Sequence, residues 1–186
     1  MRRIVMPISG YAGVGKDTFA KAMREACPDY KIVKFADALK DMLAFILDVP
    51  REHMDNPVEK VKYRGALQRL GTDVFRKQVD PDWWVRALYD KMLKDPSTRV
   101  FLVPDARFPN ELTFWNTASD VQCLPVRLDR KGIRPINAHA SEIALNLYPY
   151  WFRAFHFPED SLNTMHESAH QLALSLRELR ESLGRL

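Results

Sequence analysis

A glycine-rich segment near the start of the chain constrains its fold more than any other feature. Residues 9–18 read Ser-Gly-Tyr-Ala-Gly-Val-Gly-Lys-Asp-Thr and directly follow an apolar run at residues 4–8. Two glycines separated by four residues and followed by lysine are typical of a phosphate-binding loop between a strand and a helix. Glycine reaches positive φ, and the loop amides with the helix start offer N–H donors to an anion. We therefore predict a phosphate cradle; a glycine-rich surface turn with an unrelated lysine is the alternative.

The residues of this segment are the first candidates for binding a nucleotide. Lys16 is expected to neutralise the β- and γ-phosphates of ATP. The hydroxyl residue that usually follows the lysine and contacts Mg²⁺ is replaced by Asp17. Its carboxylate could hold the ion directly or through water, or could only favour the helix N-terminus. The predicted ATP-binding residues of the segment are Gly10, Gly13, Val14, Gly15, Lys16, Asp17 and Thr18.

Length, charge and cysteine content limit the class of protein. The 186 residues predict a single domain spanning 1–186, and the net charge of +4 suits anionic ligands such as nucleotides. The dispersed arginines give little reason to expect nucleic acid as a partner. No apolar run approaches the roughly 20 residues of a membrane span. The apolar run at residues 4–8 is too short to be the core of a signal peptide. Cys27 and Cys123 lie far apart in sequence, so we expect a cytoplasmic protein without disulfides or membrane partners; a homodimer stays open.

Hydrophobic periodicity predicts an α/β fold. Strands are expected at residues 3–8, 31–35, 99–105, 121–128 and 155–157. Helices are expected at residues 16–26, from 37, around 67–74, after Pro81, at 109–118 and at the end of the chain, whereas 49–64 reads as mobile or irregular. This alternation predicts three layers, with a mainly parallel five-stranded sheet flanked by helices. The glycine loop and Asp105 should meet at the carboxyl edge of that sheet, where ligands bind.

Several short blocks along the chain resemble the bacteriophage-type deoxynucleoside monophosphate kinases. The blocks are Gly-Lys-Asp-Thr at 15–18, Leu-Gln-Arg-Leu-Gly-Thr-Asp at 67–73, Trp-Trp-Val at 83–85, Val-Pro-Asp-Ala-Arg-Phe-Pro-Asn-Glu at 103–111 and His-Ala-Ser-Glu at 139–142. The resemblance implies the P-loop kinase fold, ATP and Mg²⁺ as cofactors, and a nucleoside monophosphate as acceptor. Phosphomevalonate kinases share a similar loop and the Asp-x-Arg-Phe-Pro-Asn-Glu block, which leaves the acceptor open but not the reaction.

Asp105 and Arg107 follow the most apolar predicted strand. Asp105 is placed like the carboxylate that holds Mg²⁺ or its waters in P-loop enzymes. We also predict that it lines the acceptor site. The alternative for Asp105 is a helix cap or turn residue. The Arg107 guanidinium can grip the acceptor phosphate at two points, which lysine cannot do. The alternative for Arg107 is an ordinary pair with Glu111 on one helix face. We take Lys16, Arg107 and Arg130 as the catalytic residues.

A basic stretch at residues 128–142 is predicted to be a lid that closes over ATP. Arg130 and Arg134 are its expected ATP ligands, with Gly132 as a candidate hinge; a solvated basic loop is the alternative. The resemblance adds His139 and Glu142 as residues lining the acceptor site.

A second acceptor-binding segment is predicted at residues 37–80. The resemblance places monophosphate recognition here, with Gln68 hydrogen-bonding the base edge; an amphipathic helix with solvated arginines is the alternative. The arginines expected near the acceptor phosphate are Arg64, Arg69 and Arg76. Together these residues predict ATP- and Mg²⁺-dependent phosphorylation of a deoxynucleoside monophosphate. The alternatives are a kinase for phosphomevalonate or dephospho-coenzyme A, and a nucleotide-gated binding or assembly ATPase.

Overall fold

The computed structural model describes residues 2–56, 58–136 and 139–183. The chain divides into two compact units. Unit 1 comprises Met1–Val33 and Asp95–Leu186, and unit 2 comprises Lys34–Lys94. The predicted phosphate loop and lid lie in unit 1, whereas the whole of the predicted acceptor-binding segment, residues 37–80, lies in unit 2.

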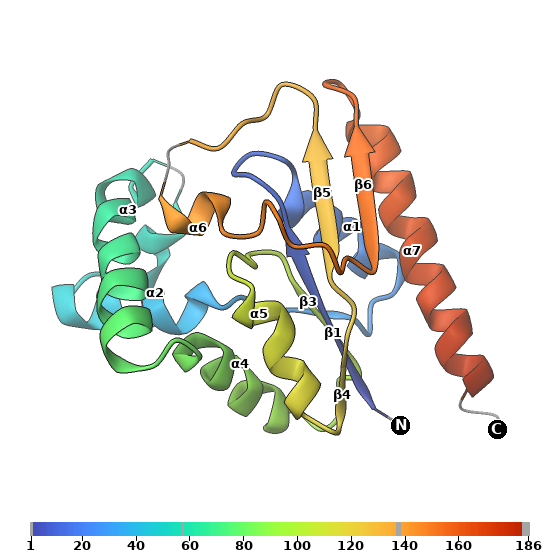
Figure 1. Cartoon of the computed structure of the whole chain (residues 1–186), viewed down its shortest axis with the longest axis horizontal. Coiled ribbons are helices and arrows are strands. Elements are labelled where there is room, and N and C mark those ends of the chain that lie inside the picture. Colours follow the sequence, from blue (N-terminus) through green and yellow to red (C-terminus); the bar gives the residue numbers. More distant parts are fainter. Residues whose placement is uncertain (1, 57, 137–138, 184–186) are drawn as a thin grey trace. The chain divides into compact units, whose positions relative to one another are not determined.

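Unit 1 is built on a parallel β-sheet (Figure 1). Its strands are β1 (Arg3–Ser9), β2 (Lys31–Ile32), β3 (Val100–Val103), β4 (Val121–Cys123), β5 (Val126–Arg130) and β6 (Arg153–Phe157). The strand order is β2-β3-β1-β5-β6, and β4 also pairs with β1. All the recorded pairings are parallel, as the alternation of strands and helices in the sequence predicted. The chain therefore leaves β1 towards one edge and leaves β3 towards the other, which makes the carboxyl ends of these two strands a switch point suited to ligands.

The predicted number of strands is wrong, because the described residues form six strands rather than five. The run 121–128, predicted as one strand, is divided into β4 and β5 at Leu124 and Pro125. Proline has no N–H to donate to a ladder. The Pro125 carbonyl instead accepts a hydrogen bond from the backbone N–H of Phe152 at 2.8 Å. The predicted strand 31–35 is also shortened to two residues, although Val33 N still donates to Leu102 O at 3.0 Å.

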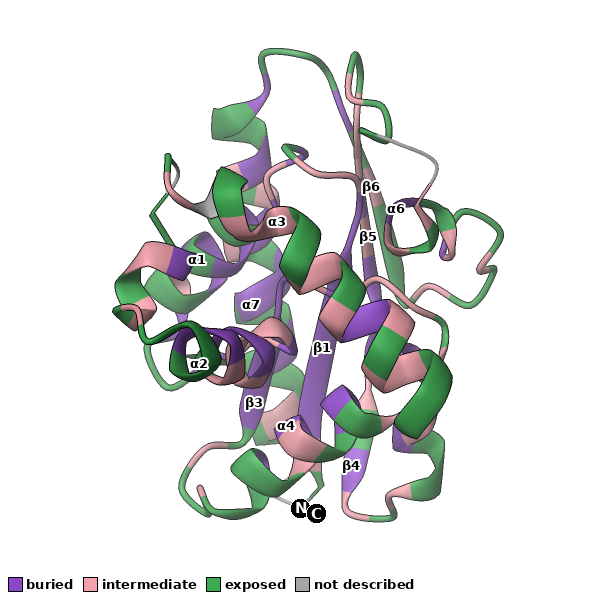
Figure 2. Ribbon diagram, turned by 90° about the vertical axis from the view of Figure 1, so that its left-hand side faces the viewer, coloured by how far each residue is buried: buried purple, intermediate pink, exposed green. Residues whose placement is uncertain are grey.

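Helices cover the sheet in unit 1. They are α1 (Lys16–Ala26), α5 (Asn110–Thr113) with the 3-10 helix η3 (Phe114–Thr117), α6 (Ala140–Ile143) and α7 (Leu162–Leu183). The core cluster joins alternate residues of β1, such as Met6 and Ile8, to Phe19 of α1 and Ala169 of α7. Val5, which strand alternation places on the other face, is also fully buried, so both faces of β1 are covered. Figure 2 shows β1 in the colour of buried residues. Of the helices in the described part of the chain, none combines the length and the hydropathy that a bilayer-spanning segment needs.

Unit 2 is helical. It contains α2 (Ala36–Leu47), the 3-10 helix η1 (Arg51–Met54), α3 (Lys60–Gln68), the π-helix η2 (Arg69–Val79) and α4 (Trp83–Leu93). The prediction that 49–64 is irregular is wrong for η1 and for the start of α3. Ion pairs explain η1, because Arg51 donates to Asp41 and to Asp55 at 2.5 Å each and so fixes a polar turn that has little hydrophobic periodicity.

Candidate phosphate-binding site

The loop between β1 and α1 has a shape that requires glycine. Gly10, Gly13 and Gly15 adopt φ values of 146°, 81° and 108°. A Cβ atom on Gly10 would lie 2.3 Å from the carbonyl oxygen of Leu128, and one on Gly15 would lie 2.7 Å from the sulfur of Met165. Both approaches are far inside van der Waals contact, so the loop packs tightly against β5 and α7. Val14 is buried within the loop, and α1 begins directly after Gly15.

Lys16 is the first residue of α1, and its side chain turns back into the loop. Its ammonium group donates to the carbonyl oxygen of Gly10 at 2.6 Å and to that of Tyr11 at 2.9 Å. The side chain is buried, and burial together with the positive charge of Arg107 lowers the pKa of Lys16 to about 7, against the opposing pull of Glu142 and nearby aspartates. A buried cation held by two carbonyl oxygens and beside an arginine is one whose charge a phosphate would stabilise strongly.

Asp17 and Asp105 are the two predicted metal ligands. Asp17 is exposed in the first turn of α1, and Asp105 is partly buried two residues beyond the end of β3. Both carboxylates act on the pKa of Lys16 and raise it, so both lie within electrostatic reach of its ammonium group. Carboxylate oxygens are ligands that Mg²⁺ accepts alongside water and substrate phosphates, so the two residues fit that ion chemically. Thr18, the remaining predicted loop residue, is exposed in α1.

Arg107 lies in the turn after β3 and is held by residues from two segments. Its guanidinium donates to Glu142 Oε1 at 2.5 Å and to the carbonyl oxygen of Ser141 at 3.1 Å. The Glu111 carboxylate accepts from the backbone N–H groups of Arg107 and Phe108, at 2.5 and 2.9 Å. Glu111 is buried, and because its carboxylate accepts from two successive N–H groups it fixes the backbone of the turn. The sequence predicted for Glu111 only a side-chain pair with Arg107; the available signal was its place as an acidic residue in the first turn of a helix.

His139 and Glu142 come from the short helix α6 and have different roles. Glu142 is buried and forms the ion pair with Arg107. His139 is the N-cap of α6, and its Nδ1 accepts from the backbone N–H of Ser141 at 3.2 Å. The histidine thus orders the turn that presents the Ser141 carbonyl and the Glu142 carboxylate to Arg107. The structure brings Lys16, Asp17, Asp105, Arg107 and Glu142 into one electrostatically coupled group.

The predicted lid begins at the end of β5. Arg130 donates to the carbonyl oxygen of Gly13 at 2.8 Å, which ties this strand end to the phosphate loop. Gly132 has φ of 84°, and Arg134 is exposed beyond it. Residues 137–138 of the predicted lid lie outside the described residues. A cavity of about 440 Å³ adjoins this strand end, and its lining includes Arg130, Lys131, Gly132, Asp160 and Asn163.

The predicted acceptor residues of unit 2 share one helical stretch. Arg64 and Gln68 lie four residues apart on α3 and so share a face. Arg69 begins η2, and Arg76 donates to the carbonyl oxygen of Pro81 at 3.2 Å. Their role towards an acceptor stays a prediction.

Comparison with known proteins finds a structural similarity to an unliganded sugar kinase from Janibacter sp.. The two chains have 15% sequence identity and a TM-score of 0.48, and the match covers 94% of each chain. No protein-family model and no curated protein sequence matches this chain. At this level of similarity the neighbour assigns neither a substrate nor a reaction.

Proposed function

We propose that this chain is a phosphotransferase that uses ATP and Mg²⁺ to convert a deoxynucleoside monophosphate into the diphosphate. The observation that carries the proposal is the pair of cations at the switch point of the sheet. Lys16 follows β1 and Arg107 follows the neighbouring β3, and burial together with the charge of Arg107 lowers the pKa of Lys16. Arg107 is paired with the Glu142 carboxylate, and a donor phosphate and an acceptor phosphate at this edge of the sheet would add the negative charge that favours a protonated Lys16.

The glycine loop supports binding of the triphosphate of ATP. Its three glycines adopt positive φ, which lets the backbone curve around an anion. The N-terminus of α1 adds unpaired backbone N–H groups that can donate to that anion. The cavity of about 440 Å³ suits the nucleoside part of ATP, because Arg130 lines it and also contacts Gly13 of the loop. Asp160 and Asn163 in its lining offer a carboxylate and an amide to ribose hydroxyls or a base edge.

The reaction we propose is a direct transfer. A phosphate oxygen of the acceptor bonds to the γ-phosphorus of ATP as the bond from that phosphorus to the β,γ-bridging oxygen breaks, which releases ADP. Catalysis of this kind is mainly positioning and neutralisation of charge. Lys16 would neutralise the transferring oxygens, Arg107 would orient the acceptor phosphate, and Arg130 would add a cation at the strand end. Mg²⁺, when bound through Asp17 and Asp105, would neutralise further phosphate charge.

The choice of a deoxynucleoside monophosphate as acceptor is supported by the ordered sequence blocks that resemble phage-type kinases. On that resemblance we assign the base and phosphate of the acceptor to Gln68 and to the arginines of unit 2. We place the reaction in the cytoplasm, or in that of a host if the chain is viral. Cys27 and Cys123 are both free thiols, which suits a reducing compartment.

The test is ADP release measured with a panel of acceptors. We expect one or more deoxynucleoside monophosphates to stimulate ADP formation by the wild-type chain, with the diphosphate as product, and stimulation at least about 10²-fold weaker in Lys16→Met. Stimulation by phosphomevalonate or dephospho-coenzyme A alone would refute the acceptor and keep phosphotransfer. A rate that no acceptor raises above that of Lys16→Met would refute the kinase and favour a nucleotide-gated binding protein.

A further inference from the structure

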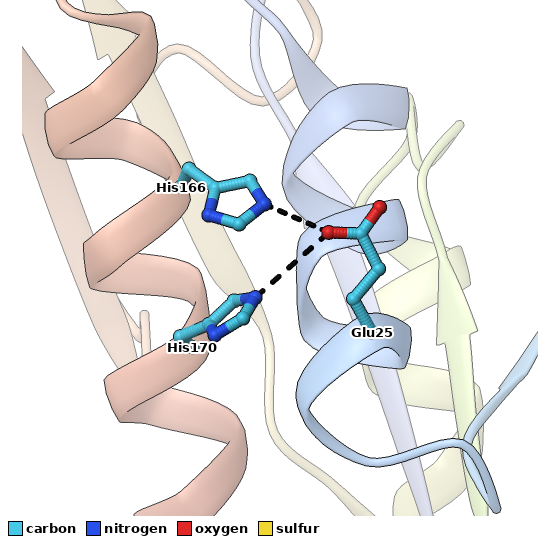
Figure 3. A group of neighbouring side chains, drawn as sticks. All are labelled: Glu25, His166 and His170. Atoms are coloured by element: carbon cyan, nitrogen blue, oxygen red, sulfur yellow. Dashed lines mark hydrogen bonds and ion pairs between the residues drawn. The ribbon is translucent and has the colours of Figure 1, made fainter.

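Two histidines and a glutamate meet on the surface of unit 1 away from the phosphate loop (Figure 3). His166 and His170 lie four residues apart on α7 and point towards Glu25 of α1. Glu25 is nine residues beyond Lys16 on α1, which corresponds to about 14 Å along a helix. The group is therefore separate from the residues proposed for phosphate transfer.

The ligand atoms are already close enough for one ion. One nitrogen or oxygen from each of the three residues lies within 4.8 Å of the others. His166 Nε2 lies 2.8 Å and His170 Nε2 3.9 Å from the same oxygen, Glu25 Oε2. Tetrahedral Zn²⁺ with bonds of about 2.0–2.2 Å separates its ligand atoms by about 3.3 Å. The distances from Glu25 fall on either side of that value, so side-chain rotations would suffice to enclose an ion.

The protein groups alone leave this arrangement incompletely paired. The imidazole rings of His166 and His170 lie with centroids 4.4 Å apart, and both turn to a single carboxylate oxygen. His170 Nε2 is buried and has no hydrogen-bond partner among the described residues. A cation bound by both histidines would give the buried His170 Nε2 a partner.

The chemistry of the three groups selects a borderline transition metal. Imidazole nitrogen and carboxylate oxygen suit Zn²⁺, whereas Mg²⁺ prefers oxygen ligands alone. The side chains of His166 and His170 are 45% and 37% exposed, which leaves room for water as a fourth ligand. The sequence His166-Glu167-Ser168-Ala169-His170 also has the histidine spacing by which helices hold zinc.

We propose that Glu25, His166 and His170 form a Zn²⁺ site that joins α1 to α7. The ion would hold together α1 and α7, which pack against each other. Its expected effect is greater resistance to unfolding, because a ligand that binds only the folded state stabilises that state.

The direct experiment is calorimetric titration of the full chain with Zn²⁺ after treatment with chelator, without nucleotide and with Mg²⁺ in excess. We expect one Zn²⁺ per chain, a rise in Tm on addition of Zn²⁺, and a visible absorption spectrum with Co²⁺ as substitute. His166→Gln, His170→Gln and Glu25→Gln should each weaken Zn²⁺ binding by at least about tenfold, because even residues that only support metal ligands have effects of that size. His156→Gln is the matched control, since His156 also faces a carboxylate, Asp129, at 3.6 Å on another element.

A saturable Zn²⁺ site that none of the three ligand variants weakens would overturn the proposal. So would the absence of saturable binding to the wild-type chain, or an equal loss in His156→Gln. Histidine ring resonances of the wild-type chain give a second measurement that needs no variant: those of His166 and His170 should shift together at one equivalent of Zn²⁺. None of these measurements uses phosphotransfer, so their outcome is independent of the proposed kinase.

Discussion

The ammonium nitrogen of Lys16 lies 2.6 Å from the carbonyl oxygen of Gly10, so the lysine is hydrogen-bonded to the loop that precedes it. Burial and the charge of Arg107 lower its pKa to about 7. The charged form of Lys16 therefore lowers the stability of the folded chain without ligand, and it strengthens the binding of an anion. Stability and binding should respond in opposite ways to changes at this position.

Replacing Lys16 with methionine should lower kcat by about 10² to 10³-fold, the effect of removing one preorganised charge donor from a transition state. It should not lower, and is expected to raise, the stability of the ligand-free chain. The unfolded chain holds the lysine proton up to pH 10.5 and the folded chain only to about 7, so the unfavourable contribution is complete below pH 7 and disappears as pH rises to 10.5. Denaturation of both proteins across this range should show the advantage of Lys16→Met shrinking with pH; a constant difference would contradict the lowered pKa.

Binding of ATP should be accompanied by proton uptake above neutral pH. At pH 8 most Lys16 side chains with a pKa of about 7 are neutral, and a bound triphosphate raises that pKa by its negative charge. Calorimetry in two buffers with different ionisation enthalpies measures the protons taken up. Lys16→Arg is the matched control, because arginine keeps its proton and should abolish the uptake while retaining a cation. Equal uptake in both proteins would assign the proton to another group.

Arg107→Lys should lower kcat/KM for the acceptor by about 10- to 100-fold and leave the KM for ATP nearly unchanged. The reason is the loss of two-point charge-assisted hydrogen bonding, worth about 1.5–3 kcal/mol. Arg177→Lys on the exposed face of α7 provides the control. The measurement is steady-state kinetics with each substrate varied in turn. An unchanged KM for the acceptor and an unchanged kcat in Arg107→Lys would contradict the assignment.

Asp17→Ala and Asp105→Ala should each raise the Mg²⁺ concentration needed for half-maximal activity, by about tenfold or more if the residue holds the ion or its waters. The titration of activity with Mg²⁺ also separates the two interpretations of Asp17. If Asp17 only stabilises the N-terminus of α1, its removal should leave the Mg²⁺ dependence unchanged and lower stability by about 0.3–1 kcal/mol.

Gly10→Ala should destabilise the chain more than Gly13→Ala. Both residues have positive φ, which costs a non-glycine residue about 1–3 kcal/mol. A Cβ on Gly10 would also meet the Leu128 carbonyl oxygen at 2.3 Å, whereas one on Gly13 would have no atom within 4 Å. Urea denaturation should therefore give a clearly lower midpoint for Gly10→Ala, and equal midpoints would mean that the contact with β5 is looser than described.

Local features of the chain were predictable from the sequence because they depend on neighbouring residues. The glycine loop, α1 at residues 16–26 and the buried strand before Asp105 follow from glycine conformation and hydrophobic period. The division of residues 121–128 at Pro125 was missed, although proline was the visible signal, because apolar content outweighed it in the prediction. The helical turns within 49–64 were missed because ion pairs of Arg51, rather than periodicity, order them.

Long-range pairs were decided only by the tertiary structure. Arg107 meets Glu142 across 35 residues, and His166 meets Glu25 across 141. The spacing of His166 and His170 is written in the sequence, but the glutamate that faces them depends on how α1 packs against α7. Periodicity and spacing determine which residues share one face of a helix or strand. Which other element packs against that face depends on the burial of apolar surface across the whole unit.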